Sequence, residues 1–342
     1  MASDKKNAMT QLTRKVILDK GFLQAEKRES PLLHALSNAG AQFVLTDTLI
    51  YEICSGSRPN EWTVAQRKLF PFHDKVEIWL HASELLEFEI RQQSPIKSPV
   101  SEELTDRVRN WFRSGLEYAP STLRALAQHE FSRREGGTAD NVFKFCQAFA
   151  QISPEYSKRC RIASKNNVNV LAADLVSRQE LVQTVARWCH GEPSNPDTFI
   201  KEAQNGLTCE WFAFHHARSA IAVALIYIRH FTTLTVPSED FRHTVVDADY
   251  ITLMHYADAL ATNETSGHMS SLTKWLLDSS KTIFSTGSLA KIIPTEEETR
   301  TVAHKVWESS GGTHGHAFDD WLLAKTRTFD ELWARLQRSR EP

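Results

Sequence analysis

The first 56 residues alternate between strand-like and helix-like segments, and this alternation constrains the fold more than any other feature. Residues 14–20, RKVILDK, form a short apolar run with β-branched side chains that ends at a polar turn. Pro31 opens an amphipathic segment that Gly40 ends, QFVLTDT at 42–48 is a second strand-like run, and a helical pattern then continues to Gly56. This order favours parallel strands joined by helical crossovers. We therefore expect an α/β fold with a parallel sheet.

The pattern changes between residues 57 and 206, where strand-like aliphatic runs are absent and helical patterns alternate with polar breaks. We interpret this range as an all-helical insertion of several antiparallel helices. A long apolar helix is expected at about 208–231, and the αβ pattern then resumes with ALAT and KTIFST as short strands. We therefore predict a core in two parts, 14–56 and 207–293. A helical insertion at 57–206 separates these parts, and a C-terminal helical extension follows at 294–342.

Length and composition agree with a helix-rich protein that has more than one substructure. The 342 residues are about twice what one ordinary hydrophobic core organises. Glycine and proline are scarce, at 13 and 12 residues, so long helices should dominate and an all-β sandwich is disfavoured. The net charge of −2 does not indicate a nucleic-acid or membrane partner, although it leaves room for a local basic patch.

The same sequence predicts a cytoplasmic protein with no membrane association. The N-terminal residues MASDKKNAMTQLTRK contain no apolar core of the kind that signal peptides have. The longest apolar run, at 220–228, is too short to span a bilayer, which needs about 20 residues. The five cysteines are scattered and include no C-x-x-C pair, so neither a disulfide framework nor a zinc finger is expected.

Acidic residues occur where an open parallel sheet places its functional groups, at the carboxyl ends of strands and the helices that follow. Asp19 ends the first strand, Glu52 lies in the helix after the second, Asp247 or Asp249 is expected to open a later helix, and Glu264 ends the next strand. Converging carboxylates repel each other unless a divalent cation neutralises them, and their hard oxygen atoms favour Mg²⁺ or Mn²⁺. Such a metal activates water and stabilises charge on a phosphodiester.

The order and spacing of these acids resemble the PIN-like nuclease family. That family has an aspartate closing strand one, a glutamate on the helix after strand two, an aspartate opening a later helix, and a threonine-x-acid at a following strand end. VILDKGFL supplies Asp19, and FVLTDTLIYEI supplies Glu52. VVDADYITLMHYADALATNE supplies Asp247 or Asp249, followed by Thr262–Asn263–Glu264. The resemblance covers about 14–55 and 208–290.

The resemblance implies a PIN-like αβα core and a Mg²⁺- or Mn²⁺-dependent nuclease that cleaves RNA in preference to DNA. Asp19, Glu52, Asp247 and Glu264 would hold the metal, with Asp249 as the alternative to Asp247. Family analogy also suggests a role as a toxin, in defence or in RNA turnover. The alternative is a non-catalytic regulatory or interaction protein with a degenerate PIN-like core and a protein partner. Glutamate at 264, where aspartate is commoner, and the near-neutral net charge favour this alternative.

Other polar motifs are interpreted mainly as structural. His73–Asp74 resembles the paired ligands of helical HD-type phosphohydrolases, a third and weaker hypothesis, but the companion His and Asp are not found. His215–His216 is expected in a helix core, and GTHGH at 312–316 in a polar loop. Asp258 is either an acid near the cleft or a turn residue. Basic residues of the insertion form a solvated face or a nucleic-acid contact surface: Lys158, Arg159, Arg161 and Lys165.

Overall fold

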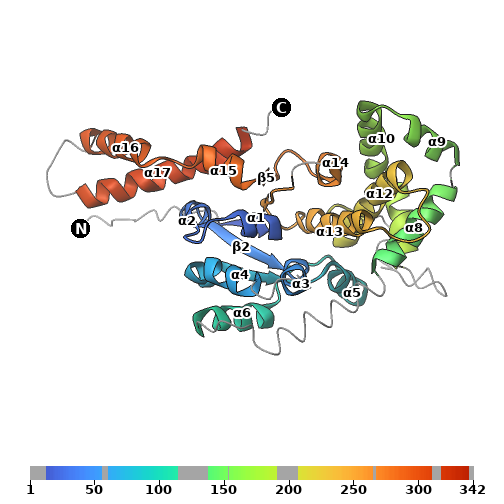
Figure 1. The fold of residues 1–342 in the computed structure, drawn as a ribbon, viewed down its shortest axis with the longest axis horizontal. Coiled ribbons are helices and arrows are strands. Elements are labelled where there is room, and N and C mark those ends of the chain that lie inside the picture. Colours follow the sequence, from blue (N-terminus) through green and yellow to red (C-terminus); the bar gives the residue numbers. More distant parts are fainter. Residues whose placement is uncertain are drawn as a thin grey trace, which may run out of the picture.

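The computed structural model describes residues 13–55, 61–114, 138–152, 154–190, 207–264, 267–309 and 317–338. They form an α/β protein in which helices surround the sheet and extend from it in both directions along the long axis of the molecule (Figure 1). The strands are β1 (Arg14–Leu18), β2 (Ala41–Thr46), β3 (Val76–Trp79), β4 (Ala259–Ala261) and β5 (Thr282–Phe284).

Helices connect the strands and extend the protein on both sides of the sheet. The first part holds α1 (Lys20–Ala25), α2 (Pro31–Asn38), α3 (Asp47–Ser55), α4 (Glu61–Leu69), the 3-10 helix η1 (Phe70–Lys75), α5 (Ala82–Gln92) and α6 (Glu102–Ser114). The middle part holds α8 (Ala139–Ile152), α9 (Pro154–Ile162), α10 (Lys165–Ser177), α11 (Gln179–His190) and α12 (Phe212–His230). The remainder holds α13 (Glu239–Leu253), α14 (Gly267–Leu276), α15 (Thr286–Ile292), α16 (Glu296–Ser309) and α17 (Ala317–Arg338).

The sheet is parallel throughout, with the order β3-β2-β1-β4-β5, which confirms the predicted fold class. Central strand β1 pairs with β2 in the register Val16↔Phe43 and with β4 in the register Ile17↔Leu260. Val16, Ile17 and Leu18 are fully buried, as expected for a parallel strand covered on both faces. The apolar, β-branched run that predicted this strand is therefore the centre of the core.

The range 57–206 is not all-helical as predicted, because it contains β3. This strand pairs with β2 in the register Leu45↔Ile78. Its four residues include Glu77, so it lacks the continuous aliphatic run that marked the other strands. The helix α6 covers its outer edge, where Ile78 N donates to Thr105 Oγ1 at 2.9 Å and Arg109 Nε donates to Val76 O at 2.9 Å. The helical middle segment thus begins only after β3.

The helix expected to open at Asp247 or Asp249 instead begins at Glu239. Ser238 caps it, since its hydroxyl accepts a hydrogen bond from Phe241 N at 3.2 Å. A serine followed by two acids is a stronger start signal than an isolated aspartate, because it satisfies a free N–H group and complements the helix dipole. Both aspartates consequently lie well inside α13, two turns or more after its first residue.

The apolar helix α12 organises the middle segment and receives its N-terminal cap from another helix. Its own cap residue, Trp211, makes no side-chain hydrogen bond there. Instead the fully buried Glu89 of α5 accepts hydrogen bonds from Phe212 N and Ala213 N, both at 2.8 Å, and from Ile96 N at 3.2 Å. A carboxylate in this place satisfies free N–H groups and the positive end of the helix dipole.

The two helices predicted for the extension are α16 and α17, which form a hairpin at the end of the molecule opposite α8–α12 (Figure 1). Trp333 fixes α17 to the core: its Nε1 donates to Ala39 O at 2.8 Å, and the Arg14 guanidinium lies 5.2 Å from its ring centre. Among the helices of the described part, none has the length and apolar character needed to cross a membrane.

Replacement of Glu89 by glutamine should destabilise the fold by about 2 kcal/mol at pH 8. The substitution turns one carboxylate oxygen into an N–H₂ group, so at least one buried backbone N–H group would lose its acceptor. Denaturant unfolding monitored by circular dichroism measures the change. Glu87→Gln is the matched control on the same helix, since Glu87 is exposed and pairs with the exposed Arg91. It should change stability by less than about 0.5 kcal/mol. Equal losses in both variants would contradict the capping role.

Candidate active site

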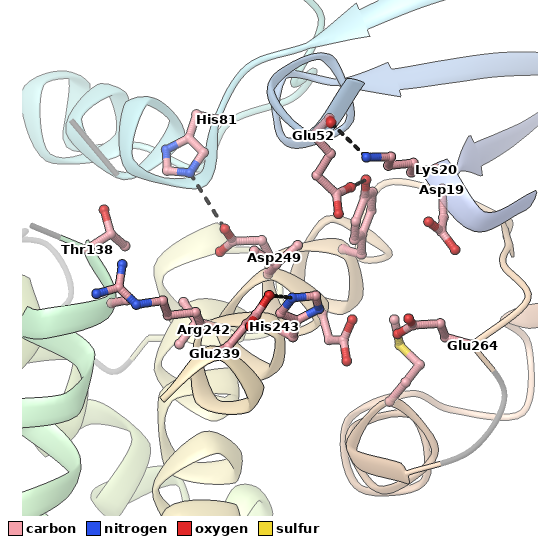
Figure 2. Close-up of a pocket in the computed structure, with 16 residues that line it drawn as sticks. Asp19, Lys20, Glu52, His81, Thr138, Glu239, Arg242, His243, Asp249 and Glu264 are labelled. Carbon is pink, nitrogen blue, oxygen red and sulfur yellow. Dashed lines mark hydrogen bonds and ion pairs between the residues drawn. The ribbon is translucent and has the colours of Figure 1, made fainter. Parts of the chain in front are cut away.

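A cavity of about 450 Å³ lies at the carboxyl edge of the sheet and is lined by all five predicted acidic residues. Asp19 comes from the junction of β1 and α1, Glu52 from α3, Asp247 and Asp249 from α13, and Glu264 from the segment after β4. The side chains of Asp19, Glu52 and Glu264 face a common space in Figure 2. The structure thus brings together residues from four separate parts of the chain.

Asp19 is held by the two strands that meet at this edge. Its backbone N–H donates to Ala261 O at 3.1 Å, which extends the β1–β4 pairing by one residue. One carboxylate oxygen caps α1 by accepting from Gly21 N at 2.8 Å, and the other accepts from the buried Thr262 hydroxyl. Burial nonetheless raises the pKa of Asp19, and the charge of Glu264 acts in the same direction. Its orientation is therefore fixed, while its negative charge is poorly compensated.

Glu52 is oriented by Tyr250 of α13, whose hydroxyl donates to Glu52 Oε2 at 2.7 Å. Lys20 Nζ approaches the same residue, but it donates to the backbone carbonyl of Glu52 at 3.0 Å and forms its ion pair with Glu61 at 3.0 Å. Burial raises the pKa of Glu52 to about 7, although the hydrogen bond from Tyr250 opposes this shift. The charge of Lys20 also opposes the rise in the pKa of Glu52, but burial outweighs it.

The two aspartates of α13, which the sequence left in competition, occupy different surroundings. The pKa of Asp247 is raised to about 8, mainly by burial and further by the charges of Glu264, Asp19 and Glu52. Asp249 instead lies 3.6 Å from His81 Nε2, with the buried His216 nearby. Asp247 is therefore the aspartate that shares the electrostatic environment of the other three acids.

The donor set fits a divalent cation in its chemistry, since Asp19, Glu52, Asp247 and Glu264 supply hard oxygen atoms and carry mutually repelling charge. Their spacing is wider than a bound ion requires: within the described residues, no group of three or more His, Cys, Asp or Glu side chains is close enough to hold a metal. Binding of a cation would have to draw these carboxylates toward each other.

The motifs interpreted as structural lie outside this cavity or on its border. At the surface, Asp74 lies 3.2 Å from His73 Nε2 and forms an ion pair with Arg113 at 2.5 Å. The His215 ring stacks on His255 with ring centres 3.9 Å apart. Asp258 accepts a hydrogen bond from Lys15 N at 2.8 Å, at the amino end of β1, so it is a turn residue remote from the site. The segment 312–316 lies outside the described residues.

The basic cluster of the middle segment is exposed but does not line the cavity. Lys158, Arg159 and Arg161 lie on α9, and Lys165 begins α10, with its side chain outside the described part. The helix α8 lies between this cluster and the cavity. Its first residue, Ala139, lines the cavity, and its 14 residues extend for about 20 Å from there. The cluster could therefore contact a long polyanion only at a part that lies far from the cavity.

The sequence analysis did not predict several residues of the cavity, among them His81, Arg242 and Tyr250. Tyr250 follows Asp247 by one helical turn, so its place on the same helix face could have been inferred. His81 lies just beyond the carboxyl end of β3, and it was overlooked because that strand was overlooked. Arg242 gave no signal, since the helix was expected to begin after it.

Comparison with known proteins identifies no relative. No family model matches the chain, and neither a curated protein nor a solved structure matches it.

The stability of the protein without divalent metal should fall as the pH rises from about 4 to about 8. The pKa values of Glu52 and Asp247 are raised in the folded state to about 7 and about 8, so the unfolded chain binds fewer protons across this range. Asp247→Asn should therefore increase the free energy of unfolding at pH 8 by at least about 1 kcal/mol. Denaturant unfolding in EDTA at several pH values measures the slope.

The control for this experiment is Asp174→Asn, because Asp174 has an exposed side chain on α10 and pairs with Arg178. It should leave the pH slope unchanged. A pH slope that stays the same in Asp247→Asn would show that Asp247 carries no unfavourable charge in the folded protein.

Proposed function

We propose that the protein is a metal-dependent nuclease that hydrolyses phosphodiester bonds. The observation that carries the proposal is the convergence of Asp19, Glu52, Asp247 and Glu264 on one cavity, where the charges of the other three acids raise the pKa of Asp247. Buried carboxylates repel each other, so a positively charged ligand would stabilise this cluster. The resemblance to the PIN-like family supports RNA as the favoured substrate.

The four carboxylates would hold Mg²⁺ or Mn²⁺. When bound, such an ion supplies charge neutralisation at the phosphodiester and lowers the pKa of water at the site. Thr262 keeps Asp19 directed into the cavity through its hydroxyl hydrogen bond, and Tyr250 does the same for Glu52. Lys20 ties the end of α3 to α1 through its bond to the Glu52 carbonyl. These contacts orient the carboxylates before substrate arrives, which is how a site limits reorganisation during reaction.

The double variant Asp19→Asn/Asp247→Asn should lose Mn²⁺-dependent cleavage of RNA by on the order of 100-fold or more, because it removes two anionic ligands of the proposed ion. Cleavage of an end-labelled oligoribonucleotide measures the loss, and circular dichroism checks that the fold is kept. Asp174→Asn is the control for removal of a carboxylate away from the cavity. Full activity in the double variant would refute the mechanism.

A second candidate is a non-catalytic interaction protein, and the wide spacing of the carboxylates favours it. The two candidates differ in metal binding. A nuclease should be stabilised by Mn²⁺ at pH 8, by about 2.7 kcal/mol at a concentration 100 times the dissociation constant, and the stabilisation should be lost in Asp19→Asn/Asp247→Asn. A wild-type melting temperature that does not respond to millimolar Mn²⁺ would favour the non-catalytic candidate.

A further inference from the structure

The cavity extends well beyond the four acids, and its far end has a different chemical character. Helix α13 runs along it: lining residues occur from Glu239 to Tyr250, which is about 16 Å of helix. Figure 2 shows Asp19 and Glu264 at one end, Arg242 and Thr138 at the other, and Asp249 between them. The cavity volume of about 450 Å³ is that of a site for a ligand rather than for an ion alone.

Two Lys or Arg side chains line this cavity, and only one is already paired within the described residues. Lys20 forms an ion pair with Glu61 at 3.0 Å. The half-buried Arg242 has a guanidinium group with no hydrogen bond or ion pair among the described residues, where only its backbone N–H is bonded, to Ser238 O. A planar guanidinium presents five donors in a fork, a geometry suited to two-pronged binding of a phosphate.

The neighbours of Arg242 add to this preference for an anion. The wall beside it includes Thr138 and Ala139 at the start of the 14-residue helix α8. Backbone N–H groups in the first turn of a helix lack helical acceptors and carry positive partial charge. His243 on the same turn of α13 is exposed and lies 3.8 Å from Glu239, so that acid has a nearer partner than Arg242.

We infer that Arg242 forms a phosphate subsite, so that the ligand of this cavity is a nucleic-acid strand with one phosphate at the carboxylates and another at Arg242. The inference rests on the proposed function, because the acids are taken as the reaction centre. Arg242 and Asp247 are separated by about 7–8 Å along the helix axis, and the Arg242 side chain points toward Thr138, away from Asp19 and Glu264 (Figure 2). A single phosphate cannot contact both ends of the cavity, so a mononucleotide with one phosphate would leave one of the two ends unoccupied.

Binding of an oligouridylate of about 12 nucleotides tests the subsite, measured by fluorescence anisotropy in EDTA with the Asp19→Asn/Asp247→Asn protein as the background. This background prevents cleavage and reduces repulsion, so the result does not depend on metal. Adding Arg242→Gln should weaken binding about tenfold, since one charged hydrogen-bonded contact is lost. The slope of log Kd against log salt should fall by about 0.7, the value for one phosphate contact with a single strand.

Two further variants make the outcome specific. Arg300→Gln removes the same charge from α16, where Arg300 is exposed and pairs with Glu296, and it should leave both the affinity and the salt slope unchanged. Arg242→Lys keeps the charge and should keep the slope. Unchanged affinity in Arg242→Gln, an equal loss in Arg300→Gln, a lowered slope in Arg242→Lys or no binding by the background protein would each overturn the subsite.

Cleavage by the wild type separates the subsite from the proposed function. If wild-type protein cleaves the oligouridylate with Mn²⁺ and Arg242→Gln binds it as tightly as before, the subsite is wrong and the nuclease proposal stands. If Arg242→Gln loses affinity and the salt slope falls, but the wild type cleaves nothing with Mn²⁺, the subsite stands and the nuclease proposal fails.

Discussion

Parallel pairing between β1 and β4 is the constraint on which the candidate site depends. It joins Asp19 to Thr262, residues 243 positions apart, and continues one step past the strands through the bond from Asp19 N to Ala261 O. Because both strands run in the same direction, their carboxyl ends meet at one edge. The acids that follow each strand are thereby placed in one cavity, and the helices that return from this edge supply Glu52 and Asp247.

The same arrangement sets a conflict between folding and the proposed chemistry. Burial and mutual repulsion raise the pKa values of Glu52 and Asp247, so the ionised cluster opposes folding at neutral pH. Two of the four carboxylates are nevertheless oriented by neutral donors, Asp19 by a threonine and Glu52 by a tyrosine. Neutral donors fix direction without cancelling charge, which keeps the oxygen atoms available to a cation.

Helix α13 connects this cluster to the helical middle segment. It contributes Asp247 and Tyr250 to the acidic end and Arg242 to the other end, while α8 and α12 pack against its other faces. The position of α12 in turn depends on the buried Glu89, which caps it from α5, directly after the strand β3 and His81. The middle segment is therefore part of the cavity wall rather than a separate attachment to the core.

The sequence by itself determined the α/β class, the strands β1, β2, β4 and β5, the helical extension, and the acids that line the cavity. Those features are local, because an apolar run or an acid at a strand end carries its signal within a few residues. Only the tertiary structure decided that β3 joins the sheet, that α13 starts at Glu239, and that Asp247 rather than Asp249 lies with the other acids. A four-residue edge strand is stabilised by its neighbours, and the choice between two aspartates depends on His81 and Glu264, which are distant in sequence.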